Sequence, residues 1–274
     1  MEIRCCFCDM DGTLLNSNNQ LDAETISALL ALKDRGIRLV LATGRSDLQI
    51  REHLSVLQID TPIITCNGGV VKDPCTGEVL SAKFFDAEDA KLLIDHCTAR
   101  GYDFLLYTPQ FVYYSEGSTR IQKYVNYNKT AEPRFHVPMR PISEFTNADL
   151  TQVVKCLVTD DLSVMEDLEK SVNPNGKLSI VSSGDRLMDI MHGHTTSKGE
   201  AVRVVCDRLG ISPEHAICFG DSPNDLTMFE TVGFAVAMGN ATDEVKCAAD
   251  FVTETNDNLG VVRALEYIFK APTL

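Results

Sequence analysis

Short, unbroken apolar runs restrict the fold of this chain more than any other feature of its sequence. Each run stops at a small or polar residue, and most are followed by a segment with helical spacing of apolar residues. Strands that are buried on both faces of a parallel sheet have such continuous apolar sequences. The runs that predict these strands are Ile3–Cys8, Ile37–Ala42, Pro62–Cys66, Ala216–Phe219 and Phe234–Met238.

Amphipathic segments with start and stop signals lie between the runs. Asp22–Arg35 ends at Gly36, Ser197–Leu209 ends at Gly210, and Asn258–Phe269 closes the pattern. Glycine directly after the last apolar position is typical of a helix C-terminus. Because strands and helices alternate, we predict an α/β chain with a Rossmann-like, doubly wound parallel-sheet core.

The middle of the chain has a different, mixed α+β pattern. We expect a helix at Ala87–Arg100, a hairpin built from Phe104–Tyr107 and Phe111–Ser115, a strand at 153–159, a helix at 163–171 and strands at 177–182 and 187–191. This pattern predicts an inserted α+β second domain of residues 84–190, and a core domain made of residues 1–83 and 191–274. Its aromatic residues have strand-like spacing, so we assign most of them to the core of this second domain rather than to ligand contacts. They are Phe104, Tyr107, Phe111, Tyr113 and Tyr114.

Charge and composition exclude several classes of partner. The chain has 39 acidic and 25 basic residues, a formal net charge of −14. This charge opposes non-specific binding to nucleic acids and to anionic membranes. It would also repel a phosphorylated ligand, so a phosphate site needs local positive charge, which a divalent cation supplies.

The cysteines and the apolar stretches indicate a reduced, cytoplasmic protein. No run reaches the roughly 18 apolar residues of a membrane helix, and the first apolar run is too short for a secretory signal. Free thiols in apolar runs behave as small hydrophobic groups, which fits a reducing compartment for the ten cysteines. Cys5 and Cys8 have C-x-x-C spacing, but positions three apart in a strand face opposite sides, which disfavours a shared metal.

Polar residues gather where the predicted strands end. Any one of them alone is an ordinary turn or cap residue. In an open α/β sheet, however, ligands bind beyond the carboxyl ends of the strands, so the set predicts one shared pocket. Its members are Asp9, Asp11, Thr43, Asn67, Asp221, Asn224 and Asp225, together with Lys198 at the start of a helix.

These residues fall within four recognisable motifs. The sequence 9–14 resembles the D-x-D-G-T-L motif of the haloacid dehalogenase (HAD) superfamily, and 42–45, 198–199 and 220–225 resemble its other three motifs. Asn67-Gly68-Gly69 and the sequence 194–201 are similar to the Cof-type subfamily, whose members carry a class IIB cap. The resemblance covers the whole chain. It implies hydrolysis of small phosphate monoesters with Mg²⁺, through an aspartyl-phosphate intermediate.

The resemblance also implies a role for each motif residue. Asp9 would be the nucleophile, and Asp11 the acid that protonates the leaving group and then activates water. Mg²⁺ would be held by the carboxylates of Asp9 and Asp221 and the backbone carbonyl of Asp11, with Asp225 bracing the site. The residues expected to bind phosphate are Lys198, Thr43, Asn224 and the backbone N–H groups of Met10 and Gly44. Arg45 and Asn67 are assigned to the leaving group, and a structural role for either is left open.

Two functions other than that of a phosphatase are also considered. A phosphomutase uses the same nucleophile, although mutases of this superfamily usually carry a smaller cap. A non-enzymatic phospho-aspartate switch uses similar residues, but receiver domains are about half this length. Sugar phosphates are the first expected substrates, with pyridoxal phosphate and flavin mononucleotide left open, and the oligomeric state is not predicted. A metal pair at His192 and His194 is disfavoured, because a carboxylate site already accounts for an ion.

Overall fold

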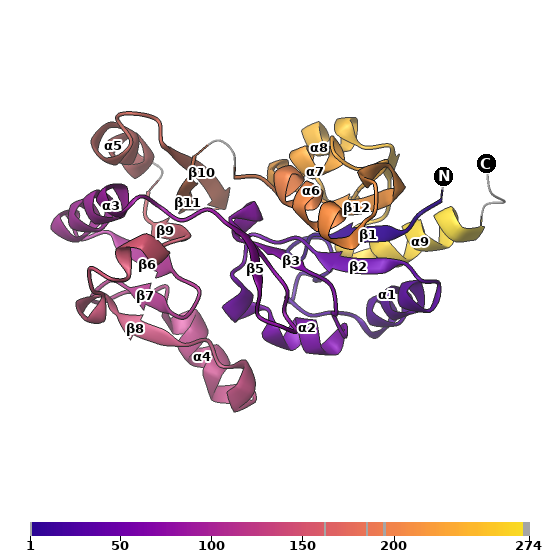
Figure 1. Cartoon of the computed structure of the whole chain (residues 1–274), viewed down its shortest axis with the longest axis horizontal. Coiled ribbons are helices and arrows are strands. Elements are labelled where there is room, and N and C mark those ends of the chain that lie inside the picture. The colour runs from indigo at the N-terminus through magenta and orange to yellow at the C-terminus, as the bar shows by residue number, and fades with distance from the viewer. Residues whose placement is uncertain (1, 162, 185, 194–195, 271–274) are drawn as a thin grey trace. The chain divides into compact units, whose positions relative to one another are not determined.

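The helices and strands of this chain form two compact units (Figure 1). The computed structural model describes residues 2–161, 163–184, 186–193 and 196–270. The first unit comprises residues up to 45, 53–81 and those from 197 onward; the second comprises 46–52 and 82–196. The domain limits derived from the sequence stay a prediction. Nothing in the sequence pattern had indicated that the segment 46–52 groups with the second unit.

A five-stranded parallel sheet forms the centre of the first unit. Its strand order is β14-β13-β12-β1-β2, and every neighbouring pair is parallel. The predicted α/β fold with a parallel core sheet is therefore confirmed. The strands are β1 (Cys5–Cys8), β2 (Arg38–Leu41), β12 (Ala216–Gly220), β13 (Phe234–Ala237) and β14 (Phe251–Val252).

The predicted strand at Pro62–Cys66 is placed differently from the other four. It forms β3 (Ile63–Thr65), which belongs to a small sheet with β4 (Val70–Lys72) and β5 (Val79–Ala82). The chain reverses after Thr65, so β4 pairs antiparallel with β3. A single parallel bridge between Ala42 and Ile64 links this small sheet to the end of β2.

Helices cover both faces of the parallel sheet (Figure 1). One face packs against α6 (Lys198–Leu209), α7 (Leu226–Phe229) and α8 (Asp243–Ala248), through a core that includes Phe7, Val205 and Phe229. On the other side, α1 (Ala23–Asp34) and α9 (Gly260–Lys270) contact each other. Ser197 caps the N-terminus of α6, where its Oγ accepts the N–H of Glu200, and Gly210 caps the C-terminus with a left-handed φ of 64°. These are the start and stop signals that the sequence predicted.

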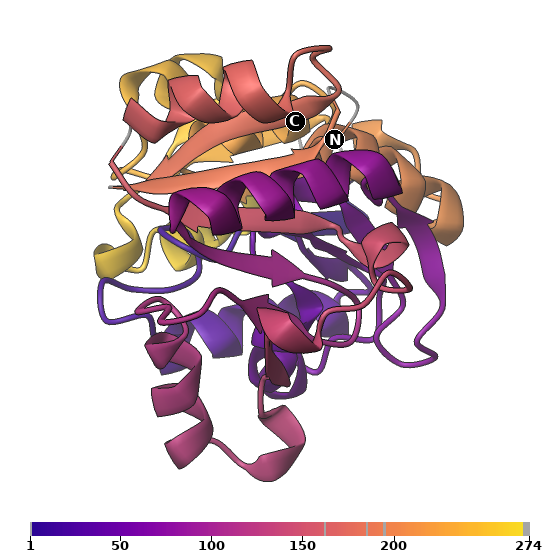
Figure 2. The ribbon, with the colours of Figure 1, turned by 90° about the vertical axis from the view of Figure 1, so that its left-hand side faces the viewer.

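The second unit is built on a six-stranded sheet of order β10-β11-β9-β6-β7-β8. Helices α3 (Ala87–Arg100) and α5 (Ser163–Val172) pack on one face against residues such as Phe104, Cys156 and Ile190 (Figure 2). On the other face, α4 (Gln122–Thr130) and Leu48 share a core with Tyr107. The strands are β6 (Asp103–Tyr107), β7 (Val112–Tyr114), β8 (Met139–Pro141), β9 (Lys155–Thr159), β10 (Leu178–Gly184) and β11 (Leu187–His192).

Short helical turns complete both units. The six-residue helix α2 spans Arg51–Val56. The 3-10 turns are η1 (Asp47–Gln49), η2 (Cys66–Gly68), η3 (Pro133–Phe135), η4 (Ile142–Glu144), η5 (Leu150–Gln152), η6 (Pro213–His215), η7 (Pro223–Asp225) and η8 (Asn256–Asn258).

Aromatic and cysteine side chains contribute mainly to the cores. Phe104, Tyr107 and Tyr113 are at most 3% exposed, and the other two aromatic residues of the predicted cluster are half-buried. All ten cysteines are free thiols. In β1, Cys5 contributes to the core beneath α6, whereas the Sγ atoms of Cys6 and Cys8 lie 3.6 Å apart. Among the residues that the structure describes, no helix is long and apolar enough to cross a membrane.

Two neighbouring leucines of α3 provide a matched test of the core of the second unit. Leu93 is 0% exposed and Leu92 is 43% exposed. Leu93→Ala leaves a cavity, so we expect a loss of about 2–5 kcal/mol of unfolding free energy. Leu92→Ala should change it by less than about 0.5 kcal/mol. Urea denaturation followed by circular dichroism measures both, and equal effects would contradict the packing described.

Candidate active site

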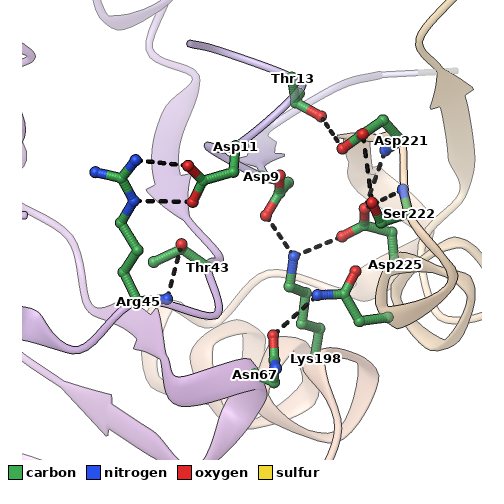
Figure 3. Close-up of polar contacts among 11 residues, drawn as sticks. Asp9, Asp11, Thr13, Thr43, Arg45, Asn67, Lys198, Asp221, Ser222 and Asp225 are labelled. Atoms are coloured by element: carbon green, nitrogen blue, oxygen red, sulfur yellow. Dashed lines mark hydrogen bonds and ion pairs between the residues drawn. The ribbon is translucent and has the colours of Figure 1, made fainter. Parts of the chain in front are cut away.

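The predicted site residues of the first unit meet at the carboxyl edge of the parallel sheet (Figure 3). Asp9 follows β1, Thr43 follows β2, and Asp221 follows β12. Lys198 is the first residue of α6, Asn67 lies in η2, and Asn224 and Asp225 lie in η7. Parallel strands direct their carboxyl ends to the same edge, which is why segments so distant in sequence converge there.

A buried ammonium group joins two carboxylates at the centre of this edge. Lys198 Nζ donates to Asp9 Oδ1 at 2.5 Å and to Asp225 Oδ1 at 2.6 Å. Lys198 and Asp225 are 0% exposed, and Asp9 is 5% exposed. Burial by itself would lower the pKa of Lys198, but the charges of Asp225 and Asp9 raise it above its usual value. The lysine is therefore a fixed positive charge beside the Asp9 carboxylate.

Burial acts on the Asp9 carboxyl in the opposite direction. Desolvation raises the pKa of Asp9 well above its ordinary value, the charge of Lys198 lowers it, and Asp225 and Asp221 raise it again. Negative charge is thus crowded around Asp9, and one ammonium group compensates only part of it. Further positive charge at this point would stabilise the ionised form of Asp9.

Asp225 is held by partners on both of its oxygens. Oδ1 accepts from Lys198, while Oδ2 accepts the backbone N–H groups of Asp221 and Ser222 at 3.0 and 3.1 Å. Ser222 and Asp225 form a capping box at the start of η7. A Cβ on Gly220 would lie 2.5 Å from the Asp225 carboxyl carbon, so this carboxylate packs directly against the end of β12. Asp225 therefore orients Lys198 and the backbone at Asp221.

Asp221 lies beside the loop that follows Asp11. Its Oδ1 accepts the hydroxyl of Thr13 at 3.2 Å, and its Oδ2 accepts the hydroxyl of Ser222 at 3.3 Å. Gly12 has a left-handed φ of 78°, and a Cβ there would lie 2.3 Å from Asp221 Oδ2. Burial, followed by the charge of Asp225, raises the pKa of Asp221 to about 6.

Asp9, Asp221 and Asp225 form a group of carboxylates able to hold a cation. One oxygen of each lies within 4.8 Å of the others. Oxygen donors of this kind fit a hard divalent ion such as Mg²⁺. The oxygens of Asp225 accept three hydrogen bonds, those of Asp221 accept two, and Asp9 Oδ1 accepts one from Lys198; which of these carboxylates would bind the ion stays a prediction. The predicted part of the Asp11 carbonyl in metal binding stays a prediction.

The Asp11 side chain is engaged by Arg45 and lies outside this group of carboxylates. Arg45 Nε donates to Asp11 Oδ2 at 2.8 Å, and Nη2 donates to Oδ1 at 2.5 Å (Figure 3). The Asp11 side chain is 52% exposed, and that of Arg45 is 15% exposed. A two-pronged guanidinium contact favours the ionised carboxylate. The family resemblance had suggested that Arg45 contacts the leaving group. The contact with Asp11 does not test that role, which stays a prediction.

The other predicted phosphate-binding groups flank the cluster. Thr43 is fully buried, and its Oγ1 accepts the N–H of Arg45 at 3.1 Å. Met10 is buried directly after Asp9, and Gly44 is half-buried in the loop after β2. Asn224 Nδ2 donates to Asn67 Oδ1 at 2.9 Å. The roles of these groups in binding phosphate stay predictions.

Sequence reasoning missed two residues that hold the site together. Thr13 and Ser222 both donate to Asp221. Ser222 precedes Asp225 by three residues, and this capping-box spacing in the sequence would have indicated a helix start at Ser222. Thr13 lies within the first motif but had no role assigned to it. His194 of the disfavoured histidine pair falls outside the described residues.

Comparison with known proteins establishes the family. A sequence model of haloacid dehalogenase-like hydrolases matches residues 6–265. A Bacillus subtilis relative named 5-amino-6-(5-phospho-D-ribitylamino)uracil phosphatase YwtE is 29% identical over 97% of this chain and 98% of its own length. Pyridoxal phosphate phosphatase YbhA of Escherichia coli is 31% identical over 90% and 92% of the two chains.

These findings define the chain as an enzyme of the phosphatase type. The chain belongs to the haloacid dehalogenase-like hydrolase family. A solved structure described as a HAD subclass IIB sugar phosphatase has a TM-score of 0.81, with 24% identity, 98% of this chain and 100% of that chain covered. At this identity the likeness establishes the fold alone. The resemblance inferred from the motifs is confirmed.

Replacing the central lysine tests the charge balance. Lys198→Met leaves two buried carboxylates without their cation, so we expect a loss of about 3–5 kcal/mol of unfolding free energy at neutral pH. The loss should shrink as the pH falls, because protonation neutralises the carboxylates. Lys170→Met is the control, since Lys170 is 72% exposed in a surface pair with Glu166 and should change stability by less than about 0.5 kcal/mol. Equal denaturation midpoints for the two variants would contradict the role of Lys198.

Proposed function

We propose that this enzyme hydrolyses phosphate monoesters of small metabolites in a Mg²⁺-dependent reaction, through a phosphorylated Asp9. The observation that supports the proposal is the Asp9 carboxylate, held by the buried Lys198 ammonium beside Asp221. A carboxylate nucleophile divides a slow hydrolysis into two easier displacements. A fixed ammonium beside it offsets the repulsion between the carboxylate and the phosphoryl dianion.

In the first displacement, Asp9 attacks phosphorus and the substrate alcohol leaves. The bond from phosphorus to the leaving oxygen breaks as the bond to the Asp9 carboxylate forms. Asp11 gives its proton to the departing oxygen. Because Arg45 contacts both oxygens of Asp11, at least one of these contacts must be released before Asp11 can carry that proton.

In the second displacement, water attacks the phosphorus of the aspartyl phosphate. Asp11 now accepts a proton from the water, Asp9 leaves as a carboxylate, and inorganic phosphate is released. The contact with Arg45 favours an ionised Asp11, which is the form that a general base requires. Lys198, Thr43 and the amide of Asn224 are the groups that we assign to the phosphoryl oxygens.

The residues present fit a magnesium ion. We assign its binding to the carboxylates of Asp9 and Asp221 and to the carbonyl of Asp11, with Asp225 holding Lys198 and the Asp221 backbone in place. When bound, Mg²⁺ supplies positive charge that stabilises the phosphoryl oxygens and the ionised carboxylates. The crowded carboxyl groups, with the raised pKa values of Asp9 and Asp221, support this assignment.

We assign the substrate to the class of small phosphorylated metabolites, with sugar phosphates as the first candidates. The two relatives above are named for a phosphoribitylamino-uracil and for pyridoxal phosphate, which are compounds of this class. The net charge of −14 disfavours nucleic acids and anionic membranes as substrates or partners. A screen of phosphorylated metabolites for release of inorganic phosphate tests the proposal, and failure to release phosphate from any of them would contradict it.

Removing the nucleophile should abolish turnover. We expect Asp9→Asn to lower kcat by at least about a thousandfold, because an amide cannot form the acyl phosphate. The control is Asp95→Asn, whose side chain is 61% exposed on α3 and should leave kcat unchanged. Phosphate release is measured for both variants, and acid-quenched wild-type enzyme is searched by mass spectrometry for phosphate on the peptide containing Asp9. Turnover of Asp9→Asn within tenfold of the wild type would refute the assignment.

Removing the metal should also stop the reaction. Chelation by EDTA is expected to abolish phosphate release, and added Mg²⁺ should restore it. Asp221→Asn replaces a charged ligand by a neutral one, so the Mg²⁺ concentration for half-maximal activity should rise by at least about tenfold. Asp95→Asn again serves as the control. Undiminished activity in chelator would remove the proposed ion from the mechanism.

A further inference from the structure

Three consecutive residues after β3 have left-handed backbone conformations. The φ angles are 50° at Cys66, 54° at Asn67 and 94° at Gly68. Only glycine adopts this region freely, so two side-chain-bearing residues here cost conformational free energy. Such strain persists where surrounding contacts hold it, and it concentrates at functional sites. The contacts of this loop therefore show what the strained backbone maintains.

The backbone of the loop 66–68 contacts two of the segments that build the active site. The N–H of Cys66 donates to the carbonyl of Arg45 at 2.9 Å, and the N–H of Asn67 donates to the carbonyl of Thr43 at 3.0 Å. A Cβ on Gly68 would lie 2.1 Å from the carbonyl oxygen of Ser197, the residue before Lys198. The loop thus packs against the loop after β2 and against the first turn of α6.

The side chain of Asn67 reaches a third segment. Asn67 is 7% exposed, and its Oδ1 accepts a hydrogen bond from Nδ2 of Asn224 at 2.9 Å. The same oxygen packs against the loop after β2, because a Cβ on Gly44 would lie only 2.8 Å from it. The Asn67 carboxamide is therefore enclosed between Gly44 and Asn224.

In this contact the nitrogen end of the Asn224 amide is the donor and the oxygen of Asn67 is the acceptor. A carboxamide has two N–H donors at one end and an acceptor oxygen at the other. When one N–H of Asn224 is bound by Asn67, the second N–H of the same nitrogen can donate to a phosphoryl oxygen. An amide rotated by half a turn would direct its oxygen there and repel the anion.

We infer that Asn67 is a positioning residue, which orients the Asn224 amide toward the phosphoryl group and does not itself contact the substrate. The inference rests on the proposed function, because it deepens the role of Asn224 in binding phosphate. It replaces the assignment of Asn67 to the leaving group. The left-handed backbone explains the residue type, since asparagine tolerates this conformation better than most residues with a side chain.

The test uses Asn67→Gly, a substitution that the backbone accepts. Glycine removes the acceptor and relieves the strain at φ 54°, so we expect the melting temperature to stay within a few degrees of the wild type. With p-nitrophenyl phosphate and Mg²⁺, kcat/KM should fall by about tenfold or more, and the inhibition constant of inorganic phosphate should rise similarly. Asn19→Gly is the matched control, because Asn19 is also left-handed, with φ 58°, and is exposed. It should leave both quantities unchanged.

A double-mutant cycle separates positioning from direct contact. If Asn67 acts through Asn224, adding Asn67→Gly to Asn224→Ala should change kcat/KM by less than about twofold. Additive losses, or an Asn67→Gly enzyme with wild-type constants, would overturn the inference. Should the wild type hydrolyse no ester, the proposed function fails, and the same cycle is then measured by calorimetric binding of inorganic phosphate with Mg²⁺. There too, additive effects or no effect of Asn67→Gly would overturn it.

Discussion

The buried ion pairs of Lys198 are the interaction on which the rest of the site depends. An ammonium group removed from water is strongly destabilising unless it is paired and hydrogen-bonded. Here Asp9 and Asp225 supply the pairing, and Asp225 is in turn held by two backbone N–H groups. A change in the position of any one of these groups leaves a charge in the interior without a partner. The end of β1, the start of α6 and the turn η7 are therefore held in one arrangement.

Backbone packing reinforces this arrangement, because several segments approach more closely than side chains would allow. A Cβ on Gly12 would lie only 2.3 Å from the Asp221 carboxylate, and the Asp225 carboxyl lies against Gly220. At the start of α6, a Cβ on Gly199 would lie 2.2 Å from the carbonyl oxygen of Thr227 in α7. The charged groups are thus confined by main chain as well as by each other. A site restricted in this way loses little conformational entropy when a ligand binds.

Patterns of apolar residues were sufficient to predict the main elements of the fold. The runs that became β1, β2, β12 and β13 are continuous and stop at small or polar residues, and α6 has clear start and stop signals. The short elements could not be predicted in this way. Strand β8, for example, has the sequence Met-Arg-Pro, which shows no strand-like alternation. It is a strand because it pairs with β7. The grouping of 46–52 with the second unit depends on the burial of Leu48, which sequence periodicity does not reveal.

The sequence predicted which residues belong to the candidate site, but it did not predict which side chains they contact. Strand ends and motifs indicated Asp9, Lys198 and Asp221, because each lies where an open α/β sheet concentrates function. The contact of Arg45 with Asp11 and that of Asn67 with Asn224 join residues 34 and 157 positions apart. Such pairings depend on the path of the chain in space, and local sequence contains little information about them.

The inserted sequence has a consequence for how this protein can change over evolutionary time. Every group that we assign to phosphoryl transfer lies before residue 82 or after residue 196, within the first unit. Apart from Leu48, the two cores on the faces of the separate sheet are built from residues between 82 and 196. Mutations can therefore accumulate in this insertion, and even remodel it, without altering the ion pairs of Lys198. The residues assigned to phosphoryl transfer and the residues of the inserted unit can therefore evolve at different rates.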